Sequence, residues 1–296
     1  MTKKHDIIWL DTTDSTNEEA RRNILSLDNL SVVSAYRQTA GRGQRGNSWS
    51  SVPGENLTFS VVIKYGHESG LVSPLRACDQ FAVSEAAALA VVDMLASHDI
   101  EAKIKWPNDI YVSDRKICGI LIENSVRDGS MASSIIGIGL NVNQTVFDPS
   151  LPNPTSIALC HSAVDQPDTQ QAWHPLPLEP LLEEFMDIFN GYCSRYLNIT
   201  GGLARLRRLY LSQMWRLNEP AQFIDYTGLS SRHLDSPINI SVSDRSDSIP
   251  TQSSGRRFKG IIRGLSTIGS LVIDDLSETH PYTREFSFKE IGFIIN

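Results

Sequence analysis

The chain has 296 residues, of which 41% are hydrophobic and 21% charged, a balance typical of a globular protein of one or two domains. Its formal net charge of -7 argues against a broad surface for nucleic acid or for an anionic membrane. The first ten residues lack the apolar stretch of a signal peptide, and we find no apolar run that approaches the length of a bilayer span. We therefore expect a cytoplasmic protein without a membrane-spanning segment.

The metal-ligating and redox-active side chains are scattered along the chain. The four cysteines, at positions 78, 118, 160 and 193, have neither the spacing of a zinc knuckle nor that of a redox pair. They are typical of reduced thiols in a cytoplasmic protein. The seven histidines are equally dispersed, so the sequence predicts no metal site built by the protein itself.

A short strand is predicted at residues 7–10, and the polar run Asp14-Ser15-Thr16-Asn17 follows it. Ser15 and Glu18 have the spacing of a capping box, which predicts a helix from about residue 15 to residue 27. The polar run would then lie at a helix N-terminus, where N–H groups and hydroxyls can serve a polar ligand. The alternative is that these side chains only cap the helix.

A predicted strand at residues 31–38 leads into Thr39-Ala40-Gly41-Arg42-Gly43-Gln44-Arg45-Gly46-Asn47-Ser48-Trp49-Ser50-Ser51. Glycine allows close backbone approach to an anion, and arginine holds a phosphate or carboxylate with a two-pronged guanidinium. Trp49 adds a flat apolar face that suits an adenine ring. The next strand is expected at 57–65, so residues 39–56 form a long connection, which is functional or disordered in a compact domain. The alternative is a flexible surface turn with solvated arginines.

An alanine-rich helix is predicted at residues 74–98, and three strands follow, at 102–106, 110–112 and 115–124, the first two joined by Pro107-Asn108-Asp109. A further strand at 131–143 contains Gly137 and Gly139, which lie on the same face because they are two residues apart. Glycines inside a strand indicate close approach by a ligand or by another backbone. This face could therefore be the floor for a flat ligand or a place of close sheet packing.

The remaining elements are expected to form the end of one domain and a small second one. Residues 144–177 are predicted to be irregular, and helices are predicted at 178–197 and 202–217. Beyond residue 219 the pattern changes to short strands separated by turns. These strands are expected at 221–226, 238–242, 258–265, 270–274 and 286–295, with a serine-rich polar insertion at 227–255.

Three elements now stand in a specific order: the glycine–arginine loop with Trp49, the run from Lys105 to Asp109 with the Arg115–Glu123 strand, and the run from Gly137 to Asn143. Together with Asp14-Ser15-Thr16-Asn17, they resemble the biotin protein ligase family, and the resemblance extends to Gly260-Ile261-Ile262-Arg263-Gly264. It implies an α+β fold. A mixed-sheet catalytic domain of the class II synthetase and biotin ligase type would span 1–219, and an SH3-like β-barrel domain would span 220–296.

The activity implied by this resemblance is ATP-dependent ligation. Biotin is activated as biotinyl-5′-AMP and is then transferred to a specific lysine of a biotin carboxyl carrier protein. A carboxylate that attacks a triphosphate brings two anions together, so positioning and charge neutralisation dominate the catalysis. ATP and biotin are the expected substrates. Mg²⁺ is expected with ATP, and it is usually held by phosphates, water and one or two carboxylates.

The resemblance also implies roles for individual residues. It assigns biotin binding to Ser15, Thr16, Gln38, Gly41, Arg42, Gly43, Lys116, Gly119, Gly137 and Gly139. It assigns ATP binding to Arg42, Gln44, Arg45, Trp49, Asn108, Lys116 and Asn141, with Trp49 stacked on adenine. The expected catalytic residues are Lys116, Arg42 and Asp109, of which Asp109 could hold the metal or orient the incoming lysine.

The sequence departs from the family pattern at two places. Gln44 stands where some members have a third arginine, a position tied to retention of the adenylate. Only about six residues precede the first strand, which leaves no room for the helix-turn-helix module of repressor-type relatives, so DNA binding is not expected. The oligomeric state, monomer or homodimer, the carrier protein and the role of the 227–255 insertion stay open.

Two alternative functions follow from the same features. A lipoate ligase or octanoyl transferase would share the catalytic fold, but it usually lacks the Trp-Pro-Asn-Asp element found here at 106–109. A non-enzymatic biotin sensor or repressor would need a DNA-binding module and would be expected to lose the two cations Arg42 and Lys116.

Overall fold

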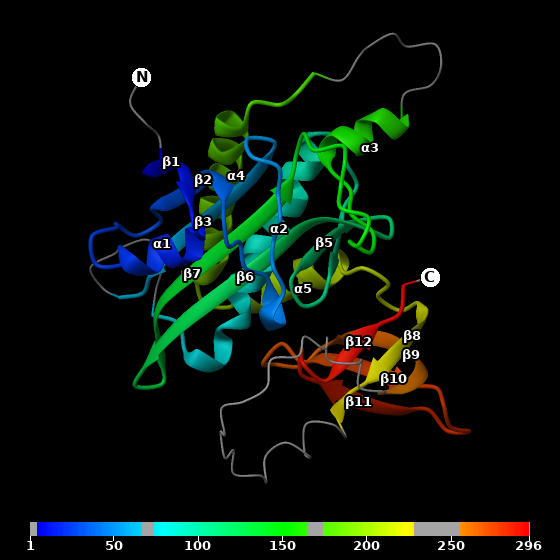
Figure 1. Cartoon of the computed structure of the whole chain (residues 1–296). Coiled ribbons are helices and arrows are strands. Elements are labelled where there is room, and N and C mark those ends of the chain that lie inside the picture. Colours follow the sequence, from blue (N-terminus) through cyan, green and yellow to red (C-terminus); the bar gives the residue numbers. More distant parts are fainter. Residues whose placement is uncertain (1–4, 67–73, 165–173, 228–254, 296) are drawn as a thin grey trace, which may run out of the picture. The chain divides into compact units, whose positions relative to one another are not determined.

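The computed structural model describes residues 5–66, 74–164, 174–227 and 255–295 (Figure 1). The chain divides into two compact units, Met1–Trp215 and Arg216–Asn296. The division falls between residues 215 and 216, whereas the sequence suggested a boundary between 219 and 220. The strand expected at 238–242 and nearly all of the polar insertion lie outside the described residues.

The first unit is built on a seven-stranded mixed sheet with the order β1-β2-β3-β7-β6-β5-β4. Its strands are β1 (Ile7–Thr13), β2 (Val32–Gln38), β3 (Asn56–Lys64), β4 (Lys103–Lys105), β5 (Asp109–Val112), β6 (Arg115–Arg127) and β7 (Ser130–Asn141). Only the β1–β2 pair of this sheet is parallel. The long β6 and β7 run side by side through its middle (Figure 1). The mixed sheet confirms the predicted α+β class.

Helices cover the two faces of this sheet unequally. The larger helix α2 (Phe81–Ser97) packs against both α4 (Leu178–Tyr192) and α5 (Gly202–Ser212), and α4 reaches the sheet where Phe185 meets Phe59 edge to face. The short α1 (Thr16–Arg22) packs on the opposite face, where Ala20 joins a cluster with Val33, Val62 and Ile135. Most of α1's face of the sheet is therefore left to other segments.

The central strand β3 is buried along almost its whole length, yet its two faces differ in chemistry. Phe59, Val61 and Ile63 are apolar and point to the side of α4, because alternate residues of a strand share a face. Asn56, Thr58 and Ser60 point to the side of α1. The cross-strand partners of Thr58 and Ser60 are the glycines Gly139 and Gly137, and Gly119 on β6 is opposite Gly139. A polar, glycine-lined surface therefore faces the α1 side.

Several helix boundaries differ from the sequence-based prediction. Helix α1 ends at Arg22 instead of about residue 27, and α4 continues as a π-helical turn, η3 (Cys193–Leu197). Helix α5 ends at Ser212, because the following backbone bonds to β4, with Gln213 accepting from and Trp215 donating to Ile104. The irregular structure predicted for 144–177 was wrong in part, since α3 (Ile157–Val164) lies within it.

One segment meets the length and composition of a membrane span. Residues Ala77–Ser97 form a helical stretch of 21 residues that begins with the turn η2 (Ala77–Asp79) and continues as α2. The expectation that no apolar run approaches this length was therefore wrong. The most apolar 18-residue part of this stretch is 67% buried. Helix α2 packs against α4, α5 and the sheet. This burial is typical of the core helix of a globular unit.

The second unit is a five-stranded antiparallel sheet with the order β11-β10-β9-β8-β12. Its strands are β8 (Pro220–Asp225), β9 (Arg256–Leu265), β10 (Leu271–Asp275), β11 (Tyr282–Phe286) and β12 (Ile291–Phe293). Phe258 stacks on Phe223 and Phe286 in its core. The single strand predicted at 286–295 was wrong, because a turn separates β11 from β12.

Candidate active site

Two cavities of the first unit meet on the glycine-lined face. The first has a volume of about 50 Å³ and is lined by Ser15, Thr16, Asn17, Gln38, Arg42, Gly43, Gln44, Trp49, Asn108, Lys116, Gly119, Ile120, Leu121, Gly137, Ile138 and Gly139. The second has a volume of about 500 Å³ and is lined by Asn47, Ser48, Trp49, Ser50, Asp109, Tyr111, Lys116, Asn141, Phe147, Leu151, Pro152, Asn153 and Pro154. Trp49 and Lys116 border both cavities.

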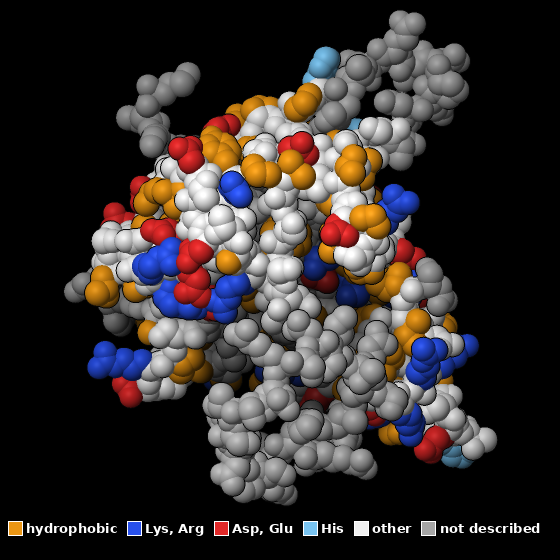
Figure 2. All heavy atoms as spheres, viewed as in Figure 1, with side chains coloured by type: hydrophobic (Ala, Val, Ile, Leu, Met, Phe, Trp, Pro, Cys, Tyr) orange, Lys and Arg blue, Asp and Glu red, His pale blue; other side chains and the backbone are white. Residues whose placement is uncertain are grey.

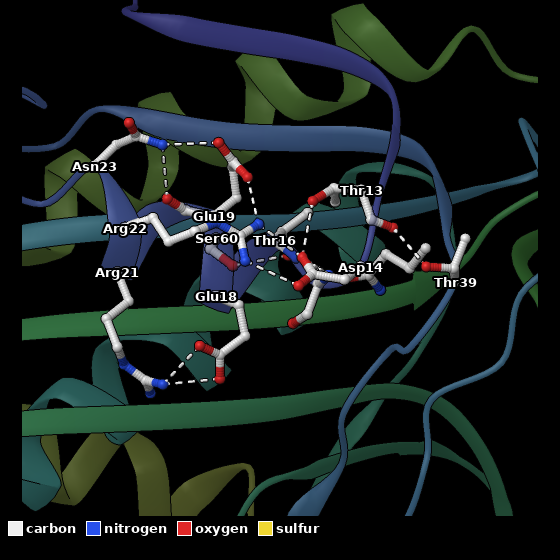
Figure 3. Close-up of polar contacts among 12 residues, drawn as sticks. Thr13, Asp14, Thr16, Glu18, Glu19, Arg21, Arg22, Asn23, Thr39 and Ser60 are labelled. Carbon is white, nitrogen blue, oxygen red and sulfur yellow. Dashed lines mark hydrogen bonds and ion pairs between the residues drawn. The ribbon is translucent and has the colours of Figure 1, made fainter.

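The polar end of the first cavity is fixed by a chain of buried and partly buried hydrogen bonds. Gln38 Oε1 accepts from the Thr16 N–H at 2.8 Å and from the Thr16 hydroxyl at 3.3 Å. The buried Ser60 hydroxyl lies 2.8 Å from Thr16 Oγ1 (Figure 3) and 2.6 Å from Asn17 Oδ1. Asn17 Nδ2 donates to Glu123 Oε2 at 3.0 Å. Each of these side chains is therefore held in one orientation by its neighbours.

This network determines which groups are available to a ligand. Gln38 Oε1 is occupied by Thr16, so the two N–H donors of its amide are the groups left for the cavity. The Ser15 side chain is buried at the cavity wall, and it makes no hydrogen bond to the helix end that it precedes. The capping box predicted for Ser15 and Glu18 was therefore wrong, because Asp14 Oδ1 accepts from the Ser15 N–H at 2.7 Å instead.

Asp14 takes its own position from an arginine. Arg22 Nη1 and Nη2 donate to its two oxygens at 2.8 and 2.7 Å (Figure 3). These bonds, together with the bond from the Ser15 N–H, hold the pKa of the Asp14 carboxyl well below its usual range. The carboxylate therefore stays ionised and keeps the start of α1 beside the first cavity.

A cluster of alternating charges borders the same cavity. Arg42 forms ion pairs with Glu18 and with Glu123, the latter at 3.4 Å, and Arg21 reaches Glu123 at 2.6 Å. Figure 2 shows basic and acidic side chains intermixed over the region where Figure 1 places α1. Arg21 also pairs with Glu18 at 2.8 Å (Figure 3). The two carboxylates hold Arg42 at the cavity wall.

The three glycines of the face accommodate side chains of the protein itself. A Cβ atom on Gly139 would lie 2.3 Å from Trp49 Cε2, and one on Gly119 would lie 3.1 Å from Trp49 Cζ3. A Cβ on Gly137 would lie 2.2 Å from Asn17 Oδ1. The indole thus lies directly on the backbone of β6 and β7. This close packing keeps the first cavity small.

Lys116 stands at the junction of the two cavities. Its Nζ lies 2.7 Å from Asp109 Oδ1 and 5.7 Å from the centre of the Trp49 ring. The second oxygen of Asp109 lies 3.7 Å from Lys105 Nζ. The carboxylate between two ammonium groups neutralises part of their charge, and the indole face adds a cation–π contact. Arg42 and Lys116 therefore share a cavity, as the sequence-based hypothesis requires.

Two side-chain amides fix the positions of segments that line the cavities. Asn108 Nδ2 donates to the Ile120 carbonyl at 2.8 Å, which ties the turn before β5 to β6. Asn141 Nδ2 donates to the Thr155 carbonyl at 2.8 Å and so fixes the end of the 142–156 segment at the second cavity. Among the described residues, no group of three His, Cys, Asp or Glu side chains could hold a metal ion. Asp109 is the carboxylate that lines the second cavity.

The structure brings nearly all of the predicted site residues together. Nine of the ten residues assigned to biotin line the first cavity. The exception, Gly41, lies beside the Trp49 backbone. The residues assigned to ATP are divided between the two cavities, and the side chain of Arg45 lies outside the described part of the chain. The roles of Ser60, Glu123 and the Phe147–Pro154 wall were not predicted from the sequence. A carboxylate within the apolar β6 segment was the available signal for Glu123.

Comparison with known proteins identifies a family and individual relatives of this chain. Residues 9–141 match the biotin/lipoate A/B protein ligase family. A biotin–[acetyl-CoA-carboxylase] ligase of Paracoccus denitrificans is 30% identical over 230 residues, which are 75% of this chain and 85% of that protein. The bifunctional ligase/repressor BirA of Escherichia coli is 33% identical over 156 residues, 53% of this chain and 46% of that protein.

The fold also matches a solved structure over nearly its full length. The biotin protein ligase of Aquifex aeolicus, in complex with biotin and ATP, superposes with a TM-score of 0.61 at 20% identity, over 95% of this chain and 99% of that one. This likeness supports the fold, and the Paracoccus relative supports the family. The chain therefore belongs to the biotin/lipoate A/B protein ligase family, and within it to the biotin protein ligases.

Proposed function

We propose that the protein activates biotin with ATP as biotinyl-5′-AMP and transfers the biotinyl group to a lysine of a biotin carboxyl carrier protein. One observation carries this proposal: a small polar cavity and a larger one meet at Lys116 and Trp49. A ligand carboxylate in the first cavity and a nucleotide phosphate in the second would meet at that ammonium. The Aquifex aeolicus relative with this fold was solved with biotin and ATP, and the Paracoccus relative is named for its action on acetyl-CoA carboxylase.

The polar end of the first cavity suits the ureido ring of biotin. Gln38 offers amide N–H donors to the ureido oxygen, and the Ser15 hydroxyl can donate to it or accept from a ureido N–H. Thr16 holds the Gln38 amide in advance and Ser60 holds Thr16, so binding at Gln38 loses little side-chain entropy. The glycine backbone and the Trp49 ring would enclose the apolar remainder of the ligand, which requires the indole to move from its present position.

In the first step, a biotin carboxylate oxygen attacks the α-phosphorus of ATP and pyrophosphate leaves with its bonding electrons. Lys116 and Arg42 neutralise charge on the carboxylate and the α-phosphate, so both anions can approach. Mg²⁺ would arrive with the triphosphate as part of the substrate. Asp109 is engaged by Lys116 at 2.7 Å, which makes it better suited to orient that ammonium than to serve as a free metal ligand.

In the second step, the neutral ε-amine of a carrier lysine attacks the carbonyl carbon of the mixed anhydride, and AMP leaves. The amine must lose a proton, and Asp109 is the carboxylate that lines the second cavity near the reacting centre. Its position next to two lysines favours the attack of an amine, because those cations stabilise the phosphate of the departing AMP.

Exchange of labelled pyrophosphate into ATP tests the first step. We expect exchange that depends on biotin and not on lipoate. Transfer of labelled biotin to a purified carrier domain tests the second step, and a carrier whose target lysine is replaced by arginine is the matched control. Exchange with lipoate alone would instead identify the protein as a lipoate ligase, and exchange with neither acid would refute the proposal.

A further inference from the structure

A pair of buried amides lies just outside the residues that border the cavities. Gln144 is 6% exposed and Asn56 is 2% exposed. Asn56 Nδ2 donates to Gln144 Oε1 at 2.5 Å, and Asn56 Oδ1 accepts from the Val142 N–H at 2.9 Å. Asn56 is at the start of β3, and Asn141, its cross-strand partner, is at the end of β7.

Gln144 extends these bonds to both walls of the second cavity. Its Oε1 also accepts from the Val52 N–H at 3.2 Å, in the loop that carries Trp49 and Ser50. Its Nε2 donates to the Val146 carbonyl at 2.8 Å, directly before Phe147, where the opposite wall of the cavity begins. One side chain thus binds the two segments that enclose the second cavity.

The hydrogen-bond partners of Gln144 are more specific than a packing role alone requires. A buried amide must satisfy its own donors and acceptor, but any backbone groups nearby could do so. In this case the partners of Gln144 are one backbone group from the segment next to each wall and the Asn56 side chain. The wall that holds Trp49 also closes the first cavity, since the indole lies on Gly119 and Gly139. A displacement of that loop by a ligand in the first cavity would therefore reach the opposite wall of the second one through Gln144.

We propose that Gln144, held by Asn56, is a positioning residue that couples the two cavities, so that occupation of the first by biotin strengthens nucleotide binding in the second. This inference rests on the proposed function. The coupling is carried by hydrogen bonds to Val52 and Val146, and Gln144 itself touches neither substrate. Loss of these bonds would leave each cavity in place but let its two walls move independently.

The test is the coupling factor between the two ligands. The dissociation constant of a non-reactive α,β-methylene analogue of ATP is measured by calorimetry with and without saturating biotin. In the wild-type chain we expect biotin to tighten nucleotide binding by about 10-fold, within the usual range of coupling between sites. In Gln144→Met, which keeps the side-chain length and removes all three bonds, we expect a factor close to one and a biotin affinity within about 3-fold of wild type.

Two further variants separate coupling from stability. Asn56→Ser keeps an acceptor near Val142, but its side chain is too short to reach Gln144. This variant should therefore lose the coupling as well. It replaces Gln144→Met in the experiment if that variant does not fold. Asn143→Ala is the matched control, because the Asn143 amide makes two bonds of 2.9 Å to the Leu176 backbone, which lines neither cavity. It should lower the thermal midpoint and keep the coupling.

The outcomes are distinguishable. A folded Gln144→Met or Asn56→Ser variant with wild-type coupling overturns this inference and leaves the proposed function intact. Wild-type protein that binds both ligands without mutual effect overturns it too. Wild-type protein that binds neither ligand refutes the proposed function and this inference with it.

Discussion

Lys116 carries the proposed chemistry at the scale of a single residue. Of the charged side chains described around the two cavities, it alone borders both. We predict that Lys116→Ala lowers biotin-dependent pyrophosphate exchange by about 100-fold or more, because a preorganised charge at the reacting phosphate is lost. The fold should persist, since the side chain is 33% exposed. The neighbouring exposed Arg115 gives the control Arg115→Ala, and near-normal exchange in Lys116→Ala would remove this lysine from the mechanism.

A second prediction concerns a buried carboxyl remote from the reacting groups. Burial raises the pKa of Glu85 from its ordinary value of 4.5 to about 7, although it pairs with Arg207. The folded state then binds this proton more tightly than the unfolded state. Stability from Glu85 is therefore fully present below about pH 4.5 and declines as the pH rises toward 7.

The variant Glu85→Gln should not show this decline. The wild-type free energy of unfolding should fall relative to that of the variant by about 3 kcal/mol between pH 4.5 and pH 7, which is the pKa shift converted to energy. Urea unfolding of both proteins across this range measures the difference. A constant difference would show that Glu85 titrates normally in the folded protein.

Most individual site residues could be predicted from the sequence, but their partners could not. Arg42 and Lys116 were predicted because they lie in the glycine–arginine loop and the Arg115–Glu123 run, two of the motifs that carry the resemblance to the biotin protein ligases. The carboxylates that hold Arg42 come from α1 and from β6, far from it in the chain. Ion-pair partners at such separations depend on how the strands are ordered in the sheet, which local patterns do not specify.

The loop that carries Trp49 is the element on which both cavities depend. Its indole lies on Gly139, where a Cβ atom would approach three ring atoms to 2.3–2.6 Å. We predict that Gly139→Ala raises the KM values for both biotin and ATP by about 10-fold, because its methyl group occupies the floor of the first cavity and keeps the indole from approaching β7. Steady-state kinetics of pyrophosphate exchange measures both values.

A loop glycine offers a matched control for this variant. Gly54 has a φ of +76° and open space around the position of a Cβ. Asparagine tolerates that conformation, so Gly54→Asn should keep wild-type KM values. If Gly139→Ala also kept wild-type KM values, neither ligand would need an open floor at this position.

At the scale of elements, the strands were easier to predict than the ends of the helices. The strands of the first unit follow runs of apolar and β-branched residues that are buried on one or both faces. Helix α5 ends early because the residues after it bond to β4, and the sequence pattern alone would have extended the helix to residue 217. Tertiary hydrogen bonds override local propensity at such ends.

At the scale of the whole molecule, the second unit contains partly buried carboxylates whose loss of charge in acid should destabilise it. In the second unit, burial opposes ionisation of Asp275, but bonds from Ser277 and Arg284 and the nearby Arg256 outweigh it and lower its pKa. The pKa of Asp225 is also lowered, against burial, by Thr227 and Arg284. These carboxylates stabilise the folded second unit above their ordinary pKa of 3.8. This stabilisation is lost as the pH falls through their lowered pKa values.

We therefore predict that the second unit loses thermal stability below about pH 4. All five tryptophans lie before residue 216, so tryptophan fluorescence reports on the first unit, whereas far-ultraviolet circular dichroism reports on both. At pH 3 part of the dichroism change should precede the fluorescence change. Arg284→Met should reduce the difference between pH 7 and pH 3, and an acid response unchanged in that variant would contradict the role of its ion pairs.

The sequence by itself determined the fold class, the family resemblance and nearly all of the residues around the first cavity. It could do so because the order and spacing of its glycine, cation and short polar motifs resemble those of the biotin protein ligases, and that resemblance implied both the fold class and the site residues. Only the tertiary structure decided that Trp49 and Lys116 separate two cavities, that carboxylates hold Arg42, and that Gln144 bonds to both walls. Those relations depend on strand order and register, which bring together residues that are tens of positions apart in the chain.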